Sequence, residues 1–212
     1  MQGSVLLATA YLPPIEYIIQ CLCFKNLLIE QFETYPKQTY RNRCIIATAN
    51  GLLHLSIPIK KPDGNHTLTR DVEIDFSGRW NQVHWRTIAS AYTHSPYFMH
   101  YGDHFEALYN DPPKHLQEFN TALLKLVFRL LKTDIALDYT SEYIVNPEGI
   151  TDLRQLIHPK HTEHYPGKPL SFIPYTQTFS NKYSFIPNLS IIDLLFNEGL
   201  SSLDFLKSNQ SL

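Results

Sequence analysis

The chain has 212 residues, of which 43% are hydrophobic and 18% are charged, a composition typical of a globular protein rather than a disordered one. This length is enough for a hydrophobic core, and we expect a single domain over residues 1–212. The 18 basic and 20 acidic side chains give a formal net charge of −2. That balance argues against a nucleic-acid partner, because duplex-binding proteins draw much of their affinity from phosphate neutralisation.

Neither the cysteines nor the apolar segments indicate export or membrane insertion. Cys21, Cys23 and Cys44 have no spacing of a disulfide framework and are typical of a reducing compartment. The start, MQGSVLLATAYLPPIEY, lacks the basic residues of a signal peptide, and two prolines directly follow its short apolar run. No apolar stretch reaches the roughly 20 residues of a membrane span. We therefore expect a cytoplasmic protein without a membrane span.

Strand and helix patterns alternate in the first part of the chain. Residues 5–12 (VLLATAYL) predict a buried strand, and residues 15–24 predict a helix with Pro14 well placed at its start. Residues 26–33 (NLLIEQFE) predict a second strand. Two apolar runs then flank Asn50-Gly51, the favoured pair for a type I′ turn, so we predict a β-hairpin there.

Helical patterns dominate the rest of the chain. Short strands are expected at residues 70–76 and 134–143, and a short helix leading into a loop is expected from residue 153. A capping-box-like start at Ser190 and Asp193 predicts a further helix that ends at Gly199. The remaining predicted helices cover residues 77–92, 96–109 and 115–132.

This order predicts the α/β class: a single layered domain with a mixed β-sheet, including the Asn50-Gly51 hairpin, packed by helices. With Asn50 and Gly51 as the loop residues, Ala47 lies opposite His54 and Ile45 opposite Ser56. The face expected to pack into the core carries Cys44, Ile46, Leu53, Leu55 and Ile57.

The other face of the hairpin carries Arg43 and His54, joined by Arg41 if the strand extends that far, while Asn42 falls with the core-facing residues. Two guanidinium groups on one surface suit a carboxylate or phosphate ligand, because each can bind it through two parallel hydrogen bonds. The alternative is a solvent-exposed strand with ordinary charges. Glu30 and Glu33 are acidic neighbours that would orient the arginines or form an ion pair with them.

His84 is the second candidate site residue. It shares a helical stripe with Trp80 and Ile88, which places it on the packed side of the helix over residues 77–92. This position suits a satisfied core histidine. The alternative is a general base at a pocket wall, where burial lowers the pKa of the imidazole.

We expect no metal site and no cofactor. His100 and His104 have a spacing of i, i+4, and residues 158–164 contain HxxHxxH, but no HExxH or cysteine-rich zinc spacing accompanies them. The sequence also lacks GxGxxG, a P-loop and GxSxG. Dinucleotide-dependent, P-loop ATPase and serine-hydrolase functions therefore have little support.

Five segments in order give the chain a family resemblance. They are YLPPIEY (11–17), YRNRC (40–44), RWNQVHWRTIASAYTHSPYFMHY (79–101), YTQTF (175–179) and NLSIIDLLFNEG (188–199). Together they resemble the WbqC-like protein family over nearly the whole chain. The family is associated with bacterial surface-polysaccharide biosynthesis, particularly of O-antigen, and the resemblance implies that role here.

The resemblance also implies which residues of this chain are functional. It implies functional positions at Tyr11, in the segment Arg41, Asn42 and Arg43, at His84 and at Gln177. Many family members carry a histidine shortly before the YLP element, where this chain has Ala8-Thr9-Ala10.

Three functional hypotheses follow. The leading one is an enzyme that transfers an acyl or aminoacyl group to an amino sugar or sugar nucleotide, with Arg41 and Arg43 holding an anion and His84 as general base. Tyr11, Asn42, Gln177 and His54 are expected to contact the ligand. The second is a non-catalytic module that binds a glycan or a partner. The third is a metal-dependent enzyme that uses His158, His161 and His164.

Overall fold

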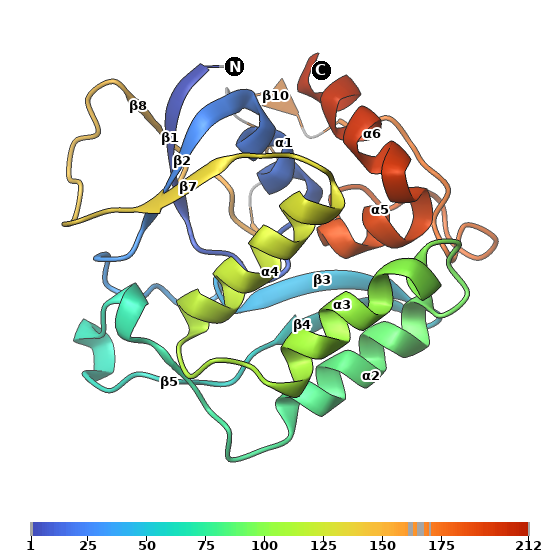
Figure 1. The fold of residues 1–212 in the computed structure, drawn as a ribbon, viewed down its shortest axis with the longest axis horizontal. Coiled ribbons are helices and arrows are strands. Elements are labelled where there is room, and N and C mark those ends of the chain that lie inside the picture. Colours follow the sequence, from blue (N-terminus) through green and yellow to red (C-terminus); the bar gives the residue numbers. More distant parts are fainter. Residues whose placement is uncertain (1, 161–162, 165–167, 170, 212) are drawn as a thin grey trace.

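The structure is a computed structural model that describes residues 2–160, 163–164, 168–169 and 171–211. A parallel sheet occupies one side of the molecule (Figure 1). Its strands lie in the order β7-β2-β1-β8. They are β1 (Gln2–Ala8), β2 (Phe24–Glu30), β7 (Ala136–Tyr139) and β8 (Ile150–Asp152). Helix α1 (Ile15–Cys23) connects β1 to β2.

β1 is central in this sheet, and its sequence explains why. Val5, Leu6 and Leu7 are fully buried, in keeping with a parallel strand that is covered on both faces. In the register with the neighbouring strands, Leu6 lies beside Leu28 of β2 on one side and beside Asp152 of β8 on the other. Whereas the prediction placed this strand at residues 5–12, it begins at Gln2 and ends at Ala8.

The predicted hairpin is present as β3 (Arg43–Thr48) and β4 (Gly51–Ser56). A second antiparallel pair joins β5 (Ile59–Lys60) to β6 (Glu73–Ile74), and a third joins β9 (Glu163–His164) to β10 (Lys168–Pro169). The α/β class is thus confirmed. Parallel and antiparallel pairing is divided among separate sheets.

The predicted register of the hairpin is wrong by one residue per strand. Thr48 pairs with Gly51, so Ala49 and Asn50 form the turn. The Thr48 hydroxyl explains this choice, because it accepts from the Asn50 backbone N–H and donates to the Gly51 carbonyl. Each residue keeps its predicted face of the hairpin, because its partner on the other strand changes by two positions and side chains alternate between the faces. Cys44 is buried as expected, whereas Leu53 is 38% exposed.

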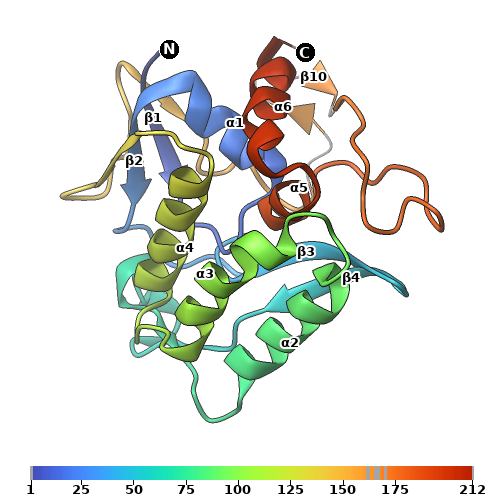
Figure 2. The same ribbon diagram turned by 45° about the vertical axis from the view of Figure 1, so that its right-hand side comes forward.

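Helices pack around the sheets (Figure 1). In Figure 2 as in Figure 1, α3 lies beside both α2 and α4, and the C-terminal helices lie beside α1. Short 3₁₀ turns cover residues 64–66, 69–71, 199–201 and 209–211. The helices are α2 (Trp80–Tyr92), α3 (Phe98–Asn110), α4 (Leu116–Leu130), α5 (Ile191–Glu198) and α6 (Ser202–Ser208). The predicted helices at 77–92, 96–109 and 115–132 are confirmed to within three residues.

Two other local predictions are wrong because tertiary contacts decide the structure. The predicted strand at 70–76 is a 3₁₀ turn followed by the two-residue β6. Residues 153–160 form turns instead of a helix. Ser190 does begin α5, but its hydroxyl donates to the Leu12 carbonyl at 2.8 Å rather than capping the helix.

Gly199 provides a test of this C-terminal packing. Its φ of +55° is disfavoured for other residues, and a Cβ at this position would overlap the ring of Tyr97. We expect Gly199→Ala to lower the free energy of unfolding by about 2 kcal/mol or more, from backbone strain and overpacking. Denaturant unfolding measures the loss. The control is Gly78→Ala, because a Cβ at Gly78 meets no atom within 4 Å. Equal losses in the two variants would contradict the packing described here.

Candidate functional site

The carboxyl ends of the parallel strands meet at one edge of the sheet. β1 ends at Ala8, β2 at Glu30 and β8 at Asp152. From β1 the chain leads to β2 on one side, whereas β8 lies on the other side, so the strand order reverses between β1 and β8. Open α/β sheets bind ligands at such a reversal, outside the carboxyl ends of the strands.

A small cavity lies at this reversal, and we call it the β1–β8 crevice. Its walls come from Ala8, Thr9 and Ala10 after β1, from Leu153, Arg154 and Ile157 after β8, and from Tyr17, Tyr40 and Arg41. Its volume of about 10 Å³ is roughly what a single water molecule needs. Two arginines from distant parts of the chain, Arg41 and Arg154, therefore line the same small space.

Arg41 reaches the crevice and is 3% exposed. Its Nε donates to Glu33 Oε1 at 2.7 Å and its Nη2 donates to Glu33 Oε2 at 2.8 Å, so the pair is bidentate and buried. Glu33 thus takes up Nε and Nη2 of Arg41 but not Nη1. The sequence-based suggestion that Glu33 orients an arginine agrees with this geometry.

Arg154 was missed by the sequence reasoning, and it is 6% exposed. Its Nη1 donates to Glu30 Oε2 at 3.0 Å, and its Nη2 donates to Asp152 Oδ2 at 2.7 Å. Glu30 also accepts from the Thr140 hydroxyl at 2.9 Å. The predicted helix from residue 153 concealed Arg154, and β8, which ends two residues before it, was not predicted.

Arg43 differs from Arg41 in its surroundings. It begins β3 opposite Ser56 and is half-buried. Its Nε is buried and has no hydrogen-bond partner, and the same is true of the hydroxyl of Tyr35. Burial raises the pKa of Tyr35, and the positive charges of Arg41 and Arg43 partly oppose that rise, so both arginines lie near this phenol. Of these two arginines, only Arg41 lines the crevice.

Asn120 of α4 ties the edge of the sheet to the arginine segment. Its Nδ2 donates to the Thr9 hydroxyl at 3.1 Å and to the Arg41 carbonyl at 2.7 Å. Asn120 is 1% exposed, and its Oδ1 has no partner. Thr9 stands in the Ala8-Thr9-Ala10 segment, so a hydroxyl occupies the region in which a histidine was expected from the resemblance.

His84 is not among the residues that line the crevice. The Tyr11 hydroxyl lies 2.9 Å from Nδ1 of His84 and also hydrogen-bonds to the Tyr109 hydroxyl, and the His84 ring donates to the backbone of Ser56. Burial lowers the pKa of His84 to about 4, and the bond to Ser56 partly opposes that shift. The imidazole is therefore neutral at pH 7, with protein partners on both sides.

The other predicted ligand contacts lie apart. Asn42 donates to the Ile57 carbonyl at 2.9 Å, which fixes the end of the hairpin. His54 is exposed on β4 opposite Ile45. Gln177 is buried, and its amide bonds to the backbone of Ile186 in both directions.

Gln177 belongs to a buried cluster around Asp193. Tyr92 donates to Asp193 Oδ2 at 2.9 Å, Tyr175 donates to Oδ1 at 2.6 Å, and Gln177 Nε2 lies 3.3 Å from Oδ1. Burial raises the pKa of Asp193, and these three hydrogen bonds oppose the rise. The cluster joins the segment around Gln177 to α2 and α5.

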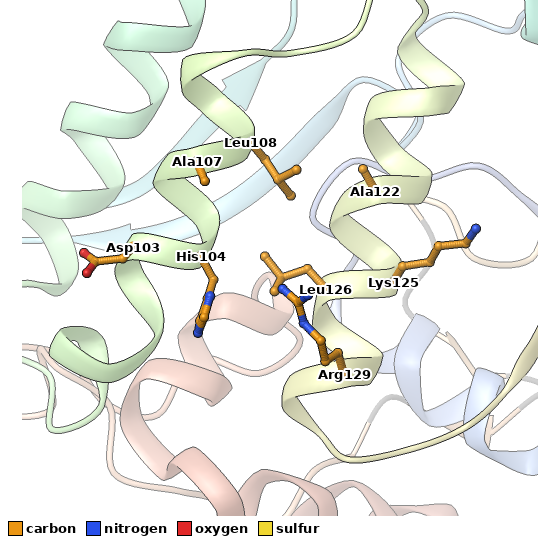
Figure 3. A pocket seen from close by; sticks show the side chains of 8 residues that line it. All are labelled: Asp103, His104, Ala107, Leu108, Ala122, Lys125, Leu126 and Arg129. Atoms are coloured by element: carbon orange, nitrogen blue, oxygen red, sulfur yellow. The ribbon is translucent and has the colours of Figure 1, made fainter.

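A separate groove of about 450 Å³ lies between α3 and α4 (Figure 3). Its lining includes His104 and Leu108 from α3 and Leu126 and Arg129 from α4. No group of three metal-ligating side chains was found among the described residues. Of the predicted histidine cluster, His161 lies outside the described residues.

The comparisons with known proteins now identify the family. The WbqC-like protein family matches residues 9–205. The chain belongs to this family. It is 22% identical over 231 residues to "Uncharacterized protein Rv1507c" of Mycobacterium tuberculosis (strain ATCC 25618 / H37Rv), and the alignment covers 98% of each chain. No solved structure matches the chain. Among the described residues, every helix is too short or too polar to cross a membrane.

The Arg41–Glu33 pair yields a stability prediction. Glu33→Gln leaves the buried Arg41 charge without its carboxylate, so we expect a loss of about 3–5 kcal/mol in the free energy of unfolding. The matched control is Glu73→Gln, which breaks the exposed 2.7 Å pair with Lys114 and is expected to change stability little. Urea titration of both variants measures the difference. A Glu33→Gln variant as stable as the control would show that the buried pair is not needed.

His84 yields a prediction on pH dependence. Its pKa is about 4 in the folded state and about 6.5 in an unfolded chain, so below pH 6.5 protons bind the unfolded state preferentially. The stability contributed by neutral His84 is complete above pH 6.5 and falls as the pH drops to 4. We expect the free energy of unfolding of His84→Gln to fall by a few kcal/mol less on acidification than that of the unmodified protein. Unfolding free energies at pH 7, 5.5 and 4.5 measure the difference. Parallel pH curves for the two proteins would refute the assignment.

Proposed function

We propose that this protein is a cytoplasmic enzyme of bacterial surface-polysaccharide biosynthesis, of the O-antigen type, that transfers an acyl or aminoacyl group to an amino sugar or sugar nucleotide. The observation that carries the proposal is the convergence of Arg41 and Arg154 on the β1–β8 crevice. The supporting argument from physics is the tendency of ligands to bind at this kind of strand reversal.

In this proposal the arginines bind the anionic part of the substrate. The bidentate bond to Glu33 uses Nε and Nη2 of Arg41, so Nη1 is the donor left for a phosphate or carboxylate. Arg43, with its unpaired Nε, and the unpaired Tyr35 hydroxyl are two further donors, and the phenol lies near Arg41. Because the crevice has room for about one water, substrate binding requires the loops after β1 and β8 to separate.

The chemistry is nucleophilic attack by the sugar amine on the carbonyl carbon of an activated acyl donor, such as a thioester. The new C–N bond forms, the bond to the leaving thiolate breaks, and a base takes the amine proton. General-base catalysis of this kind contributes about 10²–10⁴-fold in rate. The expected base is His84, and for that role the Tyr11 hydroxyl has to leave Nδ1.

A non-catalytic module that binds a glycan or a partner is the second candidate. The observation that favours it is that the polar side chains of the site already have protein partners. His84 has such partners on both sides, and Arg154 and Arg41 are held in ion pairs. In that case His84 positions Tyr11, and ligands bind without turnover.

The two candidates separate in one experiment. The protein is incubated with nucleotide sugars and acyl-CoA or aminoacyl donors, with thermal stabilisation recorded for binding and mass spectrometry for products. A bound ligand at a hundredfold excess over its Kd stabilises the native state by about 2.7 kcal/mol. We expect Arg43→Ala and Arg154→Lys to weaken nucleotide-sugar binding at least about tenfold, because both lose guanidinium geometry.

The control is Arg129→Ala, which removes an exposed arginine from the groove between α3 and α4. It is expected to bind as the unmodified protein does. Product formation that His84→Gln abolishes supports the enzyme. Binding without product supports the module, and retained turnover in His84→Gln would eliminate His84 as the base. Nucleotide-sugar binding unchanged in Arg43→Ala and Arg154→Lys would overturn the proposed anion site.

A further inference from the structure

A third hollow, distinct from the crevice and from the groove between α3 and α4, lies near the C-terminus. Its volume of about 580 Å³ is in the usual range of small-molecule sites. Aromatic rings form much of its wall, from Tyr175, Tyr183 and Phe185 in the loop before α5 and from Phe205 in α6. Thr176, Ser184 and Glu198 add hydroxyl and carboxylate groups.

The aromatic wall is held in place by its own packing. Phe185 and Phe205 both pack edge-on to Tyr175, with ring centroids 5.4 and 5.0 Å apart. The Tyr175 hydroxyl is anchored on Asp193, and the Tyr183 hydroxyl donates to the Ala49 carbonyl of the hairpin turn at 2.9 Å. These phenols are thus fixed by protein contacts, which leaves their rings as rigid surfaces for a ligand.

Glu198 is the one charged side chain among the described residues that line this hollow. It is the last residue of α5, where the helix dipole is negative and disfavours a carboxylate. No ion pair to Glu198 occurs among the described residues, although the side chain is half-buried. A cation in the hollow would relieve this unfavourable placement.

The wall composition selects the class of ligand. A carboxylate among aromatic rings attracts an ammonium group, through charge and through the electron-rich ring faces. The hydroxyls of Thr176 and Ser184 offer hydrogen bonds to further hydroxyl groups. An anionic ligand is disfavoured, since Glu198 would repel it. We propose that this hollow binds a saccharide that carries a free amino group, with the ammonium on Glu198 and the sugar ring against the aromatic wall.

This inference goes beyond the proposed function, because the hollow shares no lining residue with the β1–β8 crevice. It is tested by binding alone, without turnover. The probes are D-glucosamine, N-acetyl-D-glucosamine and D-glucuronate, with Kd values taken from NMR titration of the full chain. We expect D-glucosamine to bind most tightly and Glu198→Gln to weaken it about tenfold, with little change for N-acetyl-D-glucosamine.

The matched control is Asp204→Asn, which removes an exposed carboxylate from the neighbouring helix α6. It should leave all three Kd values unchanged. Spermidine tests whether any amine suffices, and binding as tight as that of D-glucosamine would overturn the saccharide assignment. Unchanged D-glucosamine binding in Glu198→Gln, or preferred binding of D-glucuronate, would also overturn it. Failure of the proposed transferase would instead appear as absent turnover with D-glucosamine binding intact.

Discussion

Two ion-pair systems organise the edge of the parallel sheet where β1, β2 and β8 end. Arg41 with Glu33, and Arg154 with Glu30 and Asp152, place five charged side chains where the parallel strands end. Burying such charges is costly unless each is fully paired, and a better packed apolar core could stabilise the fold as well. Their presence at the strand reversal therefore fits a site that must present guanidinium groups in one fixed orientation. The sheet supplies the rigid support for that orientation.

Local sequence patterns predicted the elements well where packing and propensity agree. The amphipathic stripes of α2, α3 and α4 are long enough to define helices without tertiary help, and Asn50-Gly51 placed the hairpin to within one residue. The errors lie where a hydrogen bond of one side chain determines the local structure. The hydrogen bonds of the Thr48 hydroxyl place the turn one residue earlier than predicted. Ser190 bonds to Leu12, which lies 178 positions away in sequence. Patterns with periods of 2 or 3.6 residues carry no information about such contacts.

The candidate site was only partly visible in the sequence for the same reason. Arg41 and its partner Glu33 could both be named from the sequence, but the second guanidinium group, of Arg154, joins them only through the sheet topology. His84 was placed correctly on the packed side of its helix. Its bond to Tyr11 spans 73 positions, and spacing along one helix cannot reveal it. The family resemblance pointed to these positions without saying which of them meet.

The central place of β1 also has a consequence for biosynthesis. During synthesis β1 gains one neighbour within 30 residues, in β2, but its other neighbour, β8, begins only at Ile150. Until β8 has been synthesised, the fully apolar segment Val5–Leu7 has an open edge. Long-range parallel pairing of this kind forms slowly and leaves strand edges exposed to aggregation. We therefore expect nascent chains that stall before residue 150 to bind chaperones.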